Sequence, residues 1–161
     1  PKSPLLRSVT VGELVRRLDA KVICCPEKDQ LLVETLSIGA MGVNSAMEFF
    51  RRRRNMAVVT GADRTDIQLA ALEASTQCLI LTGLGEPLSQ LIHRAEELEV
   101  PILKVELDTL ASVEIIEQAF GHVRIHESIK ASYAIQLVQE NVDLKRILEK
   151  IDFPCNFSDK C

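Results

Sequence analysis

Along the middle of the chain, short apolar runs alternate with longer segments in which apolar residues recur at helical spacing. Runs of about five residues bounded by turn residues are typical of strands, and the longer segments are typical of amphipathic helices. The expected strands are 56–60, 77–81 and 101–106, and the expected helices are 64–75, 87–98 and 109–119. Strands that alternate with helices of this length pair in parallel through crossover connections. The pattern therefore predicts an α/β fold.

The N-terminal part of the chain adds elements to the same fold. A helix is expected to begin at Thr10, because Thr10 and Glu13 have the spacing of a capping box. A strand at 21–25 follows, then a strand at 31–42 that leaves through glycines, and then a helix at 44–54. The whole is predicted to be a mostly parallel sheet of about five strands with helices on both faces.

The chain divides into four expected parts. Residues 1–9 are expected to be a flexible leader or the end of a linker, 10–126 the α/β domain, 127–151 an amphipathic helical extension and 152–161 a tail. Near the end of the domain, HVRIH at 122–126 alternates like a short edge strand. The apolar stripe of the extension fits a cover for one face of the sheet, or the interface of a homodimer.

Composition and charge narrow the class of partner. The 161 residues are 47% hydrophobic, which suits one domain with its own core. Nineteen basic and 23 acidic residues leave a net charge of −4, so there is no general attraction to nucleic acid or to an anionic membrane. Apolar runs stay well short of the roughly 20 residues that span a bilayer, and the opening residues lack the apolar stretch of a signal peptide. A cytoplasmic protein with small ligands or proteins as partners is expected.

Five cysteines are present, and none of their spacings is the CxxC of a zinc site or a dithiol motif. Three of them lie in apolar runs and are expected to be buried, unreactive thiols. Cys155 and Cys161 lie in the tail, where a loop would let them meet under oxidation. Cytosolic thiols are normally kept reduced, which argues against a redox role for this pair.

Two similar turns mark the candidate ligand site. AVVTGADR and LILTGLGE each end an apolar strand with Thr-Gly, at Thr60–Gly61 and Thr82–Gly83. In a parallel sheet both turns emerge at the carboxyl ends of the strands, where open α/β folds bind ligands. The segments SIGAMGVNS and VELDTL end other strands and are expected at the same edge. The residues expected to bind a ligand are Gly39, Met41, Gly61, Asp63, Arg64, Thr82, Gly83, Asp108 and Thr109.

The first of these turns carries a cluster of charged residues. Asp63 stands where the N-cap of the helix 64–75 is expected, and Asp66 lies in its first turn, so both carboxylates complement the helix dipole. Arg64 opposes the same dipole and needs a compensating anion. Asp63, Asp66, a carboxylate of a partner chain and a bound phosphate all fit that role, and the free N–H groups of a helix start suit a phosphate.

Motifs of catalysis and of metal binding are absent. The sequence has no GxxxxGK[ST] loop, no GxSxG elbow and no HExxH, so nothing supports nucleotide hydrolysis, acyl transfer or zinc proteolysis. His122 and His126 are four residues apart, but their alternation with apolar residues favours a strand over a helical metal site. No cofactor and no metal is predicted. An enzyme with Asp63, Asp66 or Asp108 as general base would lack an orienting histidine.

These motifs resemble those of a known family. TGADRTDIQLAALE, LILTGLGEPLSQLIHRAEELEVPILKVELDTLASVE, VGELVRRL and IGAMG together resemble the DRTGG domain over residues 10–125. That module accompanies a dethiobiotin-synthetase-like domain in large phosphate acetyltransferases, and lies between CBS domains in some pyrophosphatases. The resemblance equates its Asp-Arg pair with Asp63–Arg64 and its Thr-Gly-Gly with Thr82–Gly83–Leu84, so that Leu84 stands in place of a glycine.

The resemblance implies a regulatory, non-catalytic α/β module, similar in fold to the N-terminal domain of HPr kinase and usually dimeric. If the parent protein is of the phosphate-acetyltransferase type, neither its acetyl-transferring domain nor its P-loop domain is expected in this sequence. Three hypotheses follow. The chain is a ligand-sensing module for a nucleotide or another phosphorylated metabolite, or a purely structural homodimerisation domain, or, least favoured, an enzyme that uses one of the aspartates as general base.

Overall fold

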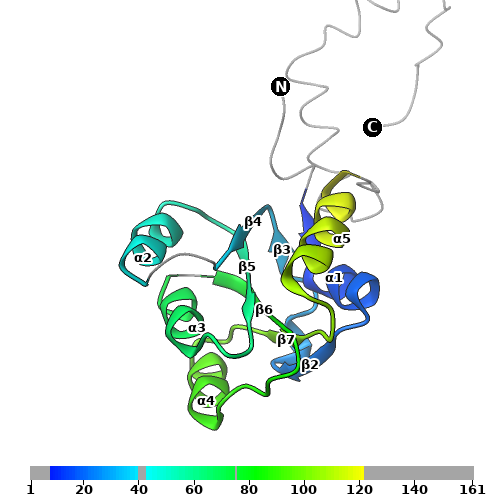
Figure 1. Ribbon diagram of the computed structural model, residues 1–161. Coiled ribbons are helices and arrows are strands. Elements are labelled where there is room, and N and C mark those ends of the chain that lie inside the picture. The colour runs from blue at the N-terminus through cyan, green and yellow to red at the C-terminus, as the bar shows by residue number, and fades with distance from the viewer. Residues whose placement is uncertain (1–7, 40–42, 75, 122–161) are drawn as a thin grey trace, which may run out of the picture. The chain divides into compact units, whose positions relative to one another are not determined.

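The computed structural model describes residues 8–39, 43–74 and 76–121 (Figure 1). Its strands are β1 (Val9–Thr10), β2 (Lys21–Cys24), β3 (Leu32–Val33), β4 (Thr35–Ile38), β5 (Met56–Gly61), β6 (Thr76–Thr82) and β7 (Ile102–Lys104). Its α-helices are α1 (Val11–Leu18), α2 (Val43–Arg51), α3 (Thr65–Leu72), α4 (Ser89–Glu97) and α5 (Thr109–Gly121), and a short 3-10 helix spans Pro26–Lys28. The elements from β5 to α5 follow the predicted order.

The central sheet has five strands in the order β2-β7-β6-β5-β4. The four strands from β4 to β7 lie side by side in chain order and are parallel. The edge strand β2 comes from the N-terminal part of the chain and pairs with β7 in the antiparallel sense. The prediction of a mostly parallel five-stranded sheet is therefore confirmed.

Helices cover both faces of this sheet (Figure 1). On one face, the buried side chains of α2, α3 and α4 pack against Val58, Leu79 and Ile102 of the strands. On the other face, α1 and α5 pack against Val59 and Ile80. Successive residues of β5 and β6 alternate between these two cores, because neighbouring side chains of a strand point to opposite faces. The central strands β5 and β6 are therefore largely apolar on both sides.

The start of α1 is capped as predicted. Thr10 is the N-cap, and its hydroxyl accepts the backbone N–H of Glu13 at 3.2 Å. The carboxylate of Glu13 does not complete the box by turning back, because it pairs with Arg17 one turn later at 2.8 Å. The cap fixes where the chain turns from β1 into the helix.

The predicted strand 31–42 is wrong in one respect. It forms two short strands in two sheets, because β3 pairs with β1 while β4 pairs with β5. The break lies at Glu34, where the backbone N–H groups of Glu34 and Thr35 both donate to the carbonyl of Asn55. Of the expected leader, residues 8 and 9 are described, and both are buried in the domain, with Val9 paired to Val33.

Several helices are shorter than predicted. The helix expected at 64–75 ends at Leu72, and the one expected at 44–54 ends at Arg51, so most of the arginine run follows the helix. The predictions for the strand 122–126, the extension 127–151 and the tail with its two cysteines lie outside the described residues. None of the described helices is both long and apolar enough to span a bilayer.

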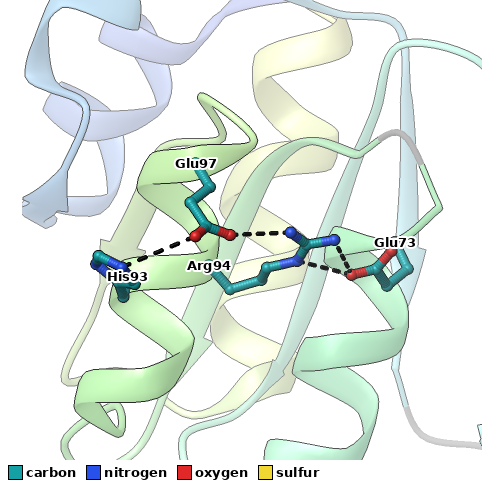
Figure 2. A network of polar contacts seen from close by, with 4 residues as sticks. All are labelled: Glu73, His93, Arg94 and Glu97. Carbon is teal, nitrogen blue, oxygen red and sulfur yellow. Dashed lines mark hydrogen bonds and ion pairs between the residues drawn. The ribbon is translucent and has the colours of Figure 1, made fainter.

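An ion-pair network joins α3 to α4 on the protein surface (Figure 2). Arg94 of α4 donates to the carboxylate of Glu73, just after α3, at 2.7 and 2.8 Å, and to Glu97 at 2.9 Å. The imidazole of His93 lies 3.8 Å from the other oxygen of Glu97. Exposed ion pairs of this kind add little stability, so the network orients two helices that the core already holds.

Candidate functional site

The ends of β4, β5 and β6 meet at one edge of the sheet, as the two Thr-Gly turns predict. The N–H of Gly39 donates to the carbonyl of Val59 at 2.8 Å, and the hydroxyl of Thr60 donates to the carbonyl of Gly39 at 3.2 Å. Gly61 is the register partner of Thr82. A side chain at Gly39 would meet a buried methyl group of α3 at 2.5 Å, so close packing requires glycine there.

The second Thr-Gly turn is tied to the start of α5. The hydroxyls of Thr82 and Thr109 are 2.8 Å apart, and the N–H of Gly83 donates to the carbonyl of Leu107 at 3.2 Å. Gly83 has φ of +82°, a conformation that side chains rarely tolerate. The structure thus places Thr82, Gly83 and Thr109 close together, as the sequence predicts. The N–H of Gly83 is used within the protein, so it is not free for an anion.

Asp108 caps α5. Its carboxylate accepts the backbone N–H of Ala111 at 2.8 Å, and its carbonyl accepts both the N–H and the hydroxyl of Ser112. A carboxylate at this position satisfies a backbone donor and complements the helix dipole. Asp108 thus has a structural role that sequence analysis expected of Asp63.

The prediction that Asp63 is the N-cap of α3 is wrong. The N-cap is Arg64, with no side-chain capping bond, and the helix begins at Thr65. The reason is a tight turn, because the N–H of Arg64 donates to the carbonyl of Gly61 and this moves the helix start along by one residue. The same carbonyl also accepts the side-chain amide of Gln68 at 2.8 Å.

Arg64 finds its anion within its own turn. Its guanidinium donates to both carboxylate oxygens of Asp66, at 3.2 and 3.3 Å. This hydrogen bond lowers the pKa of Asp66 and raises the pKa of Arg64. Asp66, one of the anions considered from sequence, thus hydrogen-bonds to Arg64, and a ligand role for Arg64 stays a prediction. A general-base role suits Asp66 poorly, because the pairing weakens it as a base.

The position of a crevice depends on which face of the sheet each connecting helix covers. The chain leaves β5 and β6 toward the same face, since α3 and α4 share one core. It leaves β7 toward the opposite face, where α5 packs. In open α/β sheets, ligands bind where the connections from adjacent strands diverge in this way. That point lies between β6 and β7. It borders the second Thr-Gly turn, which follows β6, and not the first, which follows β5.

A pocket of about 620 Å³ lies at this point. Gly83 and Leu84 line it from the loop after β6, Lys104 and Leu107 line it from β7 and its loop, and Arg17 lines it from the end of α1. Of the predicted ligand residues that the structure describes, Gly83 is the one in the lining, and Met41 lies outside the described residues. Leu84, which the resemblance places where the family has a glycine, is 93% exposed.

Lys104 is one of the pocket residues that sequence analysis missed. It is 8% exposed, and its ammonium group donates to the carbonyls of Gly83 and Val105. The signal was present in PILKVEL, where one lysine interrupts an apolar strand, because a lysine is rarely buried unless something binds its charge.

Other reactive groups lie away from the pocket. Burial raises the pKa of the Cys24 thiol to about 11, and burial likewise raises the pKa of Cys78. Thiols of this kind are poor nucleophiles. Within the described part of the chain, no group of three histidine, cysteine, aspartate or glutamate residues is placed to hold a metal ion.

Comparisons with known proteins identify relatives of this fold. A family model described as the DRTGG domain matches residues 13–119. A phosphate acetyltransferase of Nitratidesulfovibrio vulgaris is 25% identical over 154 residues, which cover 89% of this chain and 21% of the acetyltransferase. The chain thus spans about a fifth of that relative.

A solved structure is similar in fold. It contains the CBS and DRTGG domains of the regulatory region of Clostridium perfringens pyrophosphatase, complexed with its activator diadenosine tetraphosphate. The TM-score is 0.60 at 17% identity, with 83% of this chain and 60% of that chain covered.

Proposed function

The chain belongs to the DRTGG domain family, and on this premise we propose that it is a non-catalytic regulatory domain that senses a nucleotide or another phosphorylated metabolite. The observation that carries the proposal is the pocket between the ends of β6 and β7. It lies where the connections diverge to opposite faces of the sheet, the position at which this class of fold binds ligands.

Size and chemistry support a ligand of this class. A pocket of about 620 Å³ falls within the range that holds nucleotide-sized molecules. Basic, acidic and leucine side chains share its lining, which suits a molecule with an anionic part, hydrogen-bond donors and a less polar part. The similar pyrophosphatase region is complexed with a dinucleotide activator, and its likeness in fold adds to the case for a nucleotide here.

Thermal shift with the full chain tests this function. AMP, ADP, ATP and acetyl phosphate are each titrated, and at least one is expected to raise the midpoint steadily with ligand concentration, because a ligand that binds only the folded state stabilises it. A variant with Leu107→Glu, which places a carboxylate in the lining, is expected to abolish the shift. If no compound stabilises the wild-type chain at millimolar concentration, the sensing function is refuted.

Homodimerisation is the second candidate function. Exposed leucines lie on the two adjoining segments at the carboxyl edge, with Leu84 93% and Leu110 69% exposed. Large exposed apolar side chains favour association with another protein surface. Light scattering over a range of concentrations is expected to give the mass of a dimer, and Leu110→Glu is expected to give a monomer. A monomer at every concentration of the wild-type chain would refute this candidate.

The wider context is also proposed from the relatives. The similarity to about a fifth of a phosphate acetyltransferase supports a regulatory role within a protein of that type. A cytoplasmic location and the lack of nucleic-acid partners stay predictions from composition.

A further inference from the structure

Two lysines stand opposite each other in the wall of the pocket. Lys21 of β2 and Lys104 of β7 are register partners in the antiparallel pair, so their side chains lie on the same face of the sheet. Both line the pocket. Like charges directly opposite each other on neighbouring strands repel and destabilise the pairing.

Neither lysine of this pair forms an ion pair with a described residue. Among the residues that the structure describes, no carboxylate lies within ion-pair distance of either lysine, and the contacts of Lys104 are the two backbone carbonyls. Two of its three N–H donors are therefore used, and one is left. A buried ammonium group without a counter-charge is costly, so a bound anion would relieve both its desolvation and the repulsion from Lys21.

Carboxylates on the rim restrict what that anion is. Asp19, Glu86 and Glu106 also line the pocket, and all three are exposed. A third basic group, Arg17, is already paired with Glu13 at 2.8 Å. A multiply charged polyphosphate would meet this acidic rim, whereas hydroxyl and amino groups would donate hydrogen bonds to it. The lining thus favours one anionic group deep in the pocket and several donors above it.

We propose that Lys21 and Lys104 clamp a single phosphate group, and that the ligand is a nucleoside monophosphate or a similar hydroxyl-rich phosphate ester. This inference rests on the proposed sensing function and names the ligand class of the same pocket. The phosphate replaces the missing counter-charge between two strands that are far apart in sequence, and the acidic rim receives the ribose or base donors.

Isothermal titration calorimetry of the full chain tests the clamp, with AMP, adenosine and pyrophosphate as probes. AMP is expected to bind more tightly than either of the other two. Lys104→Met and Lys21→Met are each expected to weaken AMP binding by about 10- to 100-fold, the usual effect of losing a hydrogen bond to a charged group. The matched control is Lys28→Met, which removes the same charge from a lysine outside the lining, paired with Glu99 at 2.8 Å, and is expected to leave binding within about twofold.

The outcomes separate this inference from the function it rests on. If the wild-type chain binds no nucleotide of any charge, the sensing function itself is refuted. If AMP binds but both lysine variants bind it as the Lys28→Met control does, the clamp is refuted and the function stands. If adenosine or pyrophosphate binds as tightly as AMP, the single-phosphate assignment is refuted. Should Lys104→Met fail to fold, the exposed Lys21 decides the question through its own variant.

Discussion

Removing one hydroxyl from the core is expected to stabilise this protein. Ser37 of β4 is 4% exposed, and among the described residues its hydroxyl has no hydrogen-bond partner. Burying an unpartnered hydroxyl costs about 1–3 kcal/mol in proteins. Replacing it with hydrogen in Ser37→Ala loses the dispersion contacts of one atom, roughly 0.5–1 kcal/mol. The free energy of unfolding is therefore expected to rise by about 1 kcal/mol.

A second serine provides the matched control. Ser112 of α5 is 0% exposed, but its hydroxyl donates to the carbonyl of Asp108 at 2.8 Å. Ser112→Ala loses that hydrogen bond, worth about 1 kcal/mol. The better helix propensity of alanine offsets about 0.5 kcal/mol of this, so the unfolding free energy is expected to fall by about 0.5 kcal/mol. The same chemical change at two buried serines should thus have opposite signs.

Urea denaturation of the full chain, followed by circular dichroism, measures both variants. The midpoint is expected to rise for Ser37→Ala and to fall for Ser112→Ala, with an unchanged dependence on urea concentration. A fall in the midpoint for Ser37→Ala would show that the hydroxyl is satisfied in solution, and the reasoning would be refuted.

Three further predictions concern the carboxyl edge. Gly39→Ala places a methyl group 2.5 Å from a buried side chain of α3 and is expected to lower the unfolding free energy by about 1–3 kcal/mol in the same titration; an unchanged midpoint would contradict it. Asp108→Ala is expected to lower the unfolding free energy by about 1 kcal/mol, because it removes the cap of α5. Asp63→Ala is expected to lower it by less than about 0.5 kcal/mol, because Asp63 is not the N-cap of α3. Equal losses would show that Asp63 does cap its helix. Arg64→Met is expected to return the pKa of Asp66 toward 3.8 in an NMR titration, and an unchanged pKa would disprove the pairing. Because the pair lowers this pKa in the folded state, its stabilisation is present above the unfolded pKa and is lost as the pH falls through the folded pKa.

The regular part of the fold was predictable because its strands are buried on both faces. The runs MAVV and CLIL are apolar at every position, and segments of helical spacing separate them, so their order and parallel pairing follow from local pattern. The break between β3 and β4 at Glu34 has no comparable signal in the sequence pattern. It depends on the carbonyl of Asn55, which lies some twenty residues later and is turned by a positive φ of 48°. Long-range contacts of this kind are invisible to periodicity.

The sequence predicts the edge of the sheet at which the candidate site lies, but not the pocket along that edge. The Thr-Gly turns marked the carboxyl ends of the strands correctly, since parallel strands share that edge. The crevice itself depends on α4 and α5 lying on opposite faces, and an amphipathic pattern shows that a helix has a buried side without showing which face of the sheet it covers. The lysine in PILKVEL indicates a buried charge at Lys104, but the sequence does not show that Lys21 stands opposite it. They become a pair when β2 joins the sheet in antiparallel register.

The pairing of β2 with β7 also has a consequence for the order of folding. The strands from β4 to β7 add to one another as they leave the ribosome in sequence, each closing a loop of modest length. The strand β2 must wait for β7, because Lys21 and Lys104 are separated by most of the domain. Contacts of such long separation form slowly, because a long loop must close before they are made. A ligand bound to both strands would stabilise the pairing of β2 with β7, which completes the sheet. Ligand binding would therefore favour the fully folded sheet over forms in which β2 is detached.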